Sequence, residues 1–220
     1  MISLDKVNIC FSIPASPTDE FYAQIAMFRM ALDQLGGHYQ TADIAVFLGH
    51  ELDEQPPLPE YWRPHLSENV EFHWTTAREF KKKSYLAQGD ARWSHDYSDY
   101  DLVVFTDADV LVMQAFDDLI LQNQAAPAVN GVIAHYSPAI GFKKDPLVLW
   151  NDLSNMINGK PVQFQYRHTL EFERPPEFTY CPFYINFGFI AVSPEELSLF
   201  AASFLDIRAR IAEKISMPYF

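Results

Sequence analysis

Short apolar runs alternate with helical periodicity in the first fifty residues. The run at residues 6–13 is rich in β-branched and aromatic side chains and stops at a Pro-rich segment, which predicts a buried strand. Over residues 21–35 apolar side chains recur every three or four positions before two glycines, which predicts an amphipathic helix. Residues 42–49 predict a second strand. This order is typical of a βαβ unit, so the fold class is α/β with a mostly parallel sheet flanked by helices.

The same patterns predict the remaining elements. Strands are expected at residues 70–75, 102–105, 128–136 and 183–193, and helices at residues 76–88, 116–121 and 193–215. The last helix has Ser193 as its expected N-cap and Pro194 in its first position. Residues 141–179 are expected to be irregular and to form a wall facing an acceptor. Met27 and Met30 are expected in the core.

The charge balance narrows the classes of partner. The 220 residues suffice for one buried core, and 29 acidic against 16 basic residues give a formal net charge of -13. Such a surface repels nucleic-acid phosphates and anionic lipid heads, so we expect no nucleic-acid partner. No apolar stretch reaches the roughly 18 residues of a transmembrane helix. Cys10 lies in an apolar run and is expected to be a buried, inert thiol, which favours a cytoplasmic location.

Two carboxylates directly follow the most apolar strand. Asp107 and Asp109 come after the run at residues 102–105, at the carboxyl end of a strand, where open α/β sheets bind ligands. Two like charges this close are tolerated when one takes up a proton or a cation bridges them, and hard oxygen ligands suit Mg²⁺ or Mn²⁺. The alternative is that both aspartates only stabilise a turn, which aspartate favours.

With these residues the chain resembles the GT-A glycosyltransferases, and among them most the family 8 type and its relatives. The segment VVFTDADVLV, residues 103–112, is similar to the family's metal-binding strand, and YINFGFIAV, residues 184–192, is similar to its Asn-x-Gly strand. The resemblance implies a Rossmann-like GT-A domain that uses Mn²⁺ or Mg²⁺ and a nucleotide-diphosphate sugar, with a UDP-sugar favoured. The acceptor stays unknown.

The resemblance also implies roles for single residues. Asp107 and Asp109 would bind the metal and the diphosphate, with Arg78 in TTAREF as a further catalytic contact to the donor. The remaining substrate-binding candidates are Phe11, Ser12, Ile13 and Pro14 for the nucleotide base, Arg92, Ala108, Asn186 and Gly188 around the donor, and His135.

The chain departs from the family in one motif. The family supplies a third metal ligand, a histidine followed by glycine and lysine, and this sequence has no such motif. We therefore expect either that residues 1–220 are a single catalytic domain lacking its C-terminal end, or that the third ligand differs. For an inverting reaction the candidate bases are Asp152, His135 and Glu171; for a retaining reaction no base is identified.

Two alternatives have different chemistry. Phosphatases of the haloacid dehalogenase type also place Asp-x-Asp after an apolar strand and use the first Asp as nucleophile, but they favour Thr or Val where this chain has Leu111. A non-catalytic sugar- or nucleotide-binding relative is the second alternative. Its tryptophans would stack on sugar rings, although packing is the commoner role of tryptophan. These are Trp62, Trp74, Trp93 and Trp150.

Overall fold

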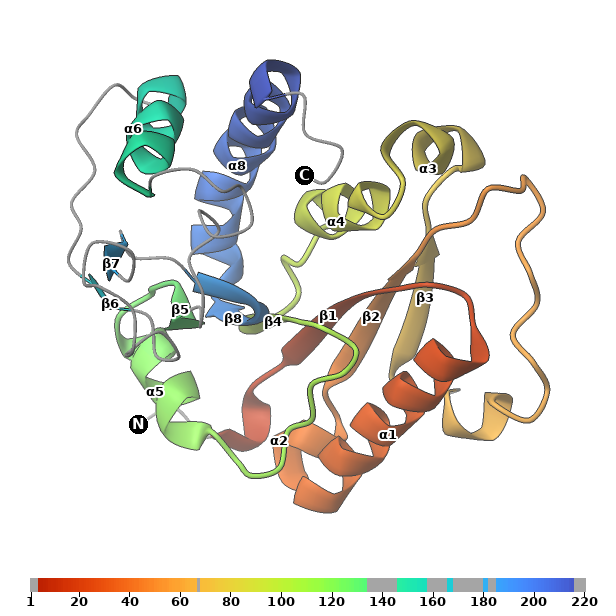
Figure 1. Cartoon of the computed structure of the whole chain (residues 1–220). Coiled ribbons are helices and arrows are strands. Elements are labelled where there is room, and N and C mark those ends of the chain that lie inside the picture. The colour runs from red at the N-terminus through yellow and green to blue at the C-terminus, as the bar shows by residue number, and fades with distance from the viewer. Residues whose placement is uncertain are drawn as a thin grey trace. The chain divides into compact units, whose positions relative to one another are not determined.

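The computed structural model describes residues 4–66, 68–133, 146–157, 166–167, 180–181 and 185–215 (Figure 1). The chain forms two compact units: Met1–Asn130 with Phe187–Ala202, and Gly131–Asn186 with Ser203–Phe220. His135 and Glu171 lie outside the described residues. In the described part, no helix is long and apolar enough to cross a membrane.

A six-stranded sheet has the order β3-β2-β1-β4-β8-β5 (Figure 1). Its strands are β1 (Ile9–Ala15), β2 (Asp43–Leu48), β3 (Val70–Trp74), β4 (Leu102–Thr106), β5 (Asn130–Ile133) and β8 (Ile185–Val192). Strands β3, β2, β1 and β4 run parallel, and β8 pairs antiparallel with β4. The predicted mostly parallel α/β sheet is confirmed.

Alternate residues of β1 face opposite layers of helices. Phe11 packs edge-on against Phe28 of α1 (Asp19–Leu35), with ring centroids 5.1 Å apart. The Ser12 hydroxyl points to the other side and lies 2.8 Å from the hydroxyl of Tyr97, in the loop after α4 (Leu86–Ser94), while Arg92 of α4 donates to the Ser12 carbonyl oxygen. Successive side chains of a strand point to opposite faces, so the two helices cover the two faces of the sheet.

Helix α1 buries the predicted apolar face and ends at Gly36, whose φ of 69° suits glycine. A four-residue helix, α2 (Gly37–Gln40), follows. The expectation for Met27 and Met30 is wrong, because they are 55% and 51% exposed. They lie off the stripe formed by Ile25, Phe28 and Leu32, and the helical spacing of apolar residues alone does not show which of them face the sheet.

The helix predicted at residues 76–88 is two helices, α3 (Ala77–Lys83) and α4. The chain breaks at Ser84, whose φ of 53° lies in the left-handed region. The Thr76 hydroxyl caps α3 by accepting from the Glu79 amide at 3.2 Å. The break lets α4 turn a second set of side chains onto the sheet: Ala87, Gln88, Arg92 and Trp93 are buried.

The expectation of irregular structure across residues 141–179 is wrong in part, because α6 (Pro146–Ile157) lies within it. Proline is tolerated in the first turn of a helix, so Pro146 starts α6 instead of breaking it. The helix predicted at residues 116–121 is longer and forms α5 (Asp117–Ala125). Short segments complete the described chain: 3-10 turns η1 (Leu4–Lys6) and η2 (Arg63–His65), and strands β6 (Tyr166–Arg167) and β7 (Tyr180–Cys181), which pair antiparallel.

The last predicted helix is confirmed as α8 (Pro194–Ile215). The Glu196 amide donates to the Ser193 hydroxyl at 3.3 Å, as an N-cap requires. Cys10 is fully buried, and burial raises the pKa of its thiol to about 12, which confirms the prediction of an unreactive cysteine.

Candidate functional site

The carboxyl ends of four parallel strands lie along one edge of the sheet. Strands β3, β2, β1 and β4 end at Trp74, Leu48, Ala15 and Thr106 in that spatial order. Parallel strands bring the polar residues that follow them to the same edge, where open α/β sheets bind ligands. The candidate site is built at this edge, in the unit that contains the N-terminal residues.

Asp107 and Asp109 sit in a tight turn directly after β4. The Val110 amide donates to the Asp107 carbonyl oxygen at 3.3 Å, which closes a four-residue turn. Asp107 is half-buried, Ala108 is buried and Asp109 is exposed. The turn therefore presents one carboxylate to solvent and holds the other against the protein.

The end of β4 is fixed to β8 beside these carboxylates. Thr106 is 1% exposed, and its hydroxyl donates to the carbonyl oxygen of Gly188 at 3.0 Å. The register pairs Thr106 with Phe189, so the next residues outward on the two strands are Asp107 and Gly188. The structure thus brings together two predicted site residues that are far apart in the sequence.

The surroundings of Asp107 raise the pKa of its carboxyl. Burial raises the pKa of its carboxyl, the guanidinium of Arg92 lowers it, and the neighbouring charge of Asp109 raises it again. Burial and a like charge both disfavour the ionised form, and a nearby cation favours it. A bound cation would therefore offset an unfavourable charge at this turn.

Arg92 supplies a buried positive charge behind the turn. Its side chain is 4% exposed, its Nη2 donates to the Ser12 carbonyl oxygen at 2.8 Å, and its guanidinium lies 4.7 Å from the centre of the Phe105 ring. Burial lowers the pKa of Arg92 to about 10, opposed by Tyr97 and Asp107, so the group stays charged at neutral pH. Its Nε has no hydrogen-bond partner among the described residues.

Tyr97 holds the backbone of Arg92 in place through a hydrogen bond. Its hydroxyl donates to the Arg92 carbonyl oxygen at 3.0 Å and lies 2.8 Å from the Ser12 hydroxyl. Strand β1, helix α4 and the loop after it are therefore joined by one buried set of hydrogen bonds. Such a network fixes the position of the guanidinium relative to the end of β4.

Gln88, one helical turn before Arg92 on α4, makes a similar hydrogen bond to the backbone of β1. Its Nε2 donates to the Ala15 carbonyl oxygen at 3.2 Å, and the side chain is 3% exposed. Gly49, just after β2, permits this close approach, because a Cβ there would lie 2.9 Å from the Gln88 side chain and would overlap the Phe80 ring. Helices α3 and α4 thus rest on the backbone at the edge of the sheet.

Not all predicted residues reach this site with their side chains. Phe11, Ser12 and Ile13 are fully buried, and of the four base-binding candidates Pro14 alone is partly exposed. Arg78 is exposed on α3, with no hydrogen bond or ion pair recorded for it in the described part of the chain. The roles predicted for these residues stay predictions.

The remaining predicted residues belong to the other compact unit. His135 and Glu171 are not described, and of Asn186 the structure describes the backbone in β8 alone. Asp152 is exposed on α6, in the other unit.

Three residues of the buried network were missed by the sequence analysis: Gly49, Gln88 and Tyr97. The signal for Gln88 was its spacing, since it lies four residues before Arg92 and therefore on the same face of a helix. Nothing in the sequence distinguishes Tyr97 from the other tyrosines, because its role depends on contacts across the sheet.

Asp107 and Asp109 form an oxygen donor set that suits a hard divalent cation. Across the described ranges, no group of three or more His, Cys, Asp or Glu side chains is arranged to hold a metal ion. Mg²⁺ is commonly bound through one or two carboxylates with water and substrate phosphates in the other positions, so two aspartates in an open turn fit this mode. A site closed by protein ligands alone would require more donors than these two.

Comparisons with known proteins show the fold. No known protein family matches the sequence, and no curated protein matches it significantly. The galactosyltransferase LgtC, solved with donor and acceptor sugar analogues, has a TM-score of 0.56 at 14% identity, with 97% of this chain and 67% of that chain covered.

Two fungal structures give similar values. The mannosyltransferase Ktr4p of S. cerevisiae has a TM-score of 0.55 at 11% identity, over 94% of this chain and 62% of Ktr4p. Core-mannan synthase A from Aspergillus fumigatus, in its Mn/GDP form, has a TM-score of 0.54 at 10% identity, over 93% and 65%. The chain thus spans about two thirds of the length of these proteins, and it has the GT-A fold of glycosyltransferases.

Proposed function

We propose that the chain is a metal-dependent glycosyltransferase that moves a sugar from a nucleotide-diphosphate donor to an acceptor. The observation that carries this proposal is the turn with Asp107 and Asp109 at the carboxyl end of β4, backed by the buried charge of Arg92, in a GT-A fold. The core-mannan synthase structure is in a Mn/GDP form, and the LgtC structure holds donor and acceptor sugar analogues, which supports the same class of ligand here.

Asp107 and Asp109 would hold Mn²⁺ or Mg²⁺ together with the donor diphosphate. When bound, the metal supplies Lewis-acid stabilisation of the negative charge that grows on the leaving diphosphate. The chain provides a fixed frame for this, because Thr106 and Gly188 fasten the end of β4. Burial raises the pKa of Asp107, and Arg92 opposes that rise and so favours the ionised carboxylate, which is the form that binds a cation.

Positive side chains on α3 would add a second contact to the donor. Arg78 stands in the first turn of α3, and Lys81 and Lys82 are exposed on the same helix. Lys83 is already paired with Asp90 at 2.7 Å. In a chain with a net charge of -13, these exposed cations would attract an anionic donor to this edge of the sheet.

A donor hydrolysis and transfer assay tests the proposal. The protein would be incubated with UDP-sugars and GDP-sugars and a panel of acceptors, with Mn²⁺ or with EDTA, and the released nucleoside diphosphate measured. Metal-dependent release that is lost in Asp107→Asn and kept in Asp99→Asn, an exposed aspartate before β4, would support the enzyme.

Other outcomes favour the alternatives. Metal-dependent binding without any donor turnover would favour a non-catalytic binding relative. Incorporation of phosphate on Asp107 from a phosphomonoester would favour the phosphatase and contradict the glycosyltransferase.

A further inference from the structure

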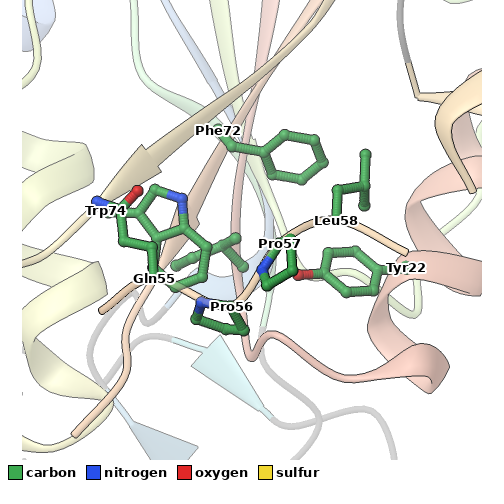
Figure 2. A pocket seen from close by; sticks show the side chains of 8 residues that line it. Tyr22, Gln55, Pro56, Pro57, Leu58, Phe72 and Trp74 are labelled. Carbon is green, nitrogen blue, oxygen red and sulfur yellow. The ribbon is translucent and has the colours of Figure 1, made fainter. Parts of the chain in front are cut away.

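Two histidines from distant parts of the sequence lie side by side on one face of the sheet. The imidazole rings of His73, in β3, and His95, directly after α4, have centroids 4.5 Å apart. Phe72 and Trp74 of β3 line a pocket on the face that α1 covers (Figure 2). Successive side chains of a strand alternate, so His73 points to the opposite face, which α4 covers. Neither histidine belongs to the site at the aspartate turn.

Aromatic rings hold the two imidazoles in place. The Phe47 ring of β2 stacks on the His73 ring, with centroids 5.0 Å apart and an angle of 24° between the planes. The same Phe47 ring lies edge-on to His95 at 5.4 Å, and the Tyr97 ring lies edge-on to it at 4.7 Å. Phe47 is 1% exposed, and both histidines are half-buried. The two imidazoles therefore share one buried apolar ring as their support.

The surroundings of His95 disfavour its charged form. Burial lowers the pKa of His95 and the neighbouring charge of His73 lowers it further, whereas the carboxylates of Asp96 and Glu71 raise it. The Glu71 carboxylate is 74% exposed and lies 3.6 Å from Nε2 of His73, so water screens its charge. That Nε2 has no hydrogen-bond partner among the described residues. The carboxylates therefore do not cancel the repulsion between two protonated imidazoles.

A cavity lies next to His95. Its volume is about 350 Å³, and it is lined by the loop after α4 and by the start of α8. The carboxylates in this lining are Asp96 of the loop and Glu195 of α8, both beside His95 in the cavity wall. Water in such a cavity can deliver a proton to His95 while the protein stays folded.

The loop that carries His95 also holds part of the site in place. Two residues further on, the Tyr97 hydroxyl donates to the Arg92 carbonyl oxygen at 3.0 Å and lies 2.8 Å from the Ser12 hydroxyl. Movement of His95 away from His73 would pull on these hydrogen bonds. The position of the Arg92 backbone is therefore linked to the contact between the two histidines.

We infer that His73 and His95 form a pH-sensitive contact, which holds the loop after α4 against β3 at neutral pH and releases it when both imidazoles are protonated. A histidine whose pKa is lower in the folded state gives its full stability above its unfolded pKa of about 6.5. That stability is lost as the pH falls from there to the folded pKa. The effect on donor binding rests on the proposed function, whereas the contact itself does not.

Amide hydrogen exchange between about pH 7.5 and pH 5 tests the contact without any donor. The reporters are the amides of Tyr100 and Asp101, which donate to the carbonyl oxygens of Tyr97 and Asn8 at 3.1 and 2.8 Å. We expect their protection, corrected for the intrinsic exchange rate, to fall by up to about tenfold per pH unit, because opening of the loop takes up one proton. Protection within α1 should stay constant.

Two variants remove the contact without removing an aromatic ring. His95→Phe keeps a ring against Phe47 and takes away the titrating group, so it should abolish the pH dependence of the reporter amides. His73→Phe takes away the neighbouring charge and should reduce that dependence. The control is the same substitution at an exposed histidine outside the pair, His65→Phe, which should keep the wild-type profile.

Three results would overturn the inference. They are constant protection of the reporter amides in the wild type, equal pH dependence in the wild type and in His95→Phe, and a parallel loss of protection in α1, since acid would then unfold the whole unit instead of the loop. Opening of the loop that depends on His95, in a protein that transfers no sugar, would keep the contact and reject the glycosyltransferase alone.

Discussion

At the scale of single residues, the charge of Asp107 lowers the stability of the fold, and the same charge is available to bind a cation. Its carboxyl is half-buried beside Asp109, and burial and that neighbouring charge raise its pKa despite Arg92. A carboxyl whose pKa is higher in the folded state stabilises the fold most below its unfolded pKa. That stability is lost as the pH rises from the unfolded to the folded pKa, and at neutral pH the charge is a net cost.

We therefore expect Asp107→Asn to raise the free energy of unfolding of the metal-free protein at pH 7 by no more than about 0.5 kcal/mol, because solvent screens the interactions of a half-buried carboxyl. The amide keeps the shape of the side chain and removes the disfavoured charge. Chemical denaturation at pH 7 and at pH 3.5 measures the effect, and the gain should shrink at the lower pH because the wild-type carboxyl is then protonated. Equal stability of the two proteins at pH 7 would contradict this account of Asp107.

The position of Arg92 beside Asp107 depends on tertiary packing, which its place in the sequence does not show. The sequence analysis gave Arg78 and Arg92 as donor contacts, and it placed Arg78 in the family's motif. In the structure Arg92 lies close enough to Asp107 to lower its pKa, and the role predicted for Arg78 stays a prediction. Nothing in the spacing of residues shows which side of α4 faces the end of β4, since that depends on how the helix packs on the sheet.

At the scale of elements, the two helices α3 and α4 rest on Gly49. A Cβ at this position would overlap the Phe80 ring of α3 and crowd Gln88 of α4. We expect Gly49→Ala to lower the free energy of unfolding by about 1 to 3 kcal/mol, because overpacking forces the helices to move. Thermal denaturation checks this, and Gly49→Ala combined with Phe80→Leu should recover part of the loss. An unchanged melting temperature in Gly49→Ala would show that the space between Gly49, Phe80 and Gln88 can accept a methyl group.

The break between these helices occurs at Ser84, which has a positive φ. Its φ of 53° is unfavourable for a residue with a side chain and favourable for glycine. Ser84→Gly should therefore stabilise the protein by about 0.5 to 1 kcal/mol, while Ser94→Gly in the last turn of α4 should not. Urea denaturation of both variants compares them directly. Destabilisation by Ser84→Gly would mean that the break has another cause.

Elements differed in how far the sequence predicted them. Strands β1, β2 and β4 and helix α1 follow continuous patterns, and all were predicted. Helix α6 was missed because Pro146 at its start and Pro161 after it suggest a loop, and the α3–α4 break was missed because its residues favour helix locally. In each missed case, a local pattern pointed away from the structure that tertiary packing stabilises.

At the scale of the whole molecule, an acidic chain would bind an acidic substrate. The net charge of -13 opposes binding of a diphosphate, and Asp107 and Asp109 add negative charge at the proposed diphosphate site. A divalent cation reverses the local charge, and so the account requires metal and nucleotide to bind together. The GT-A fold brings the residues for this to one edge of the sheet.

Thermal stability with and without Mn²⁺, across a panel of nucleoside diphosphates and nucleotide sugars, tests this requirement most directly. A ligand that binds the folded state alone stabilises it, by about 2.7 kcal/mol at a concentration 100 times its Kd. We predict a rise in Tm with one nucleotide in the presence of Mn²⁺, lost in EDTA and in Asp109→Asn and kept in Asp99→Asn. A nucleotide-dependent rise that persists in EDTA or in Asp109→Asn would contradict the proposed metal site.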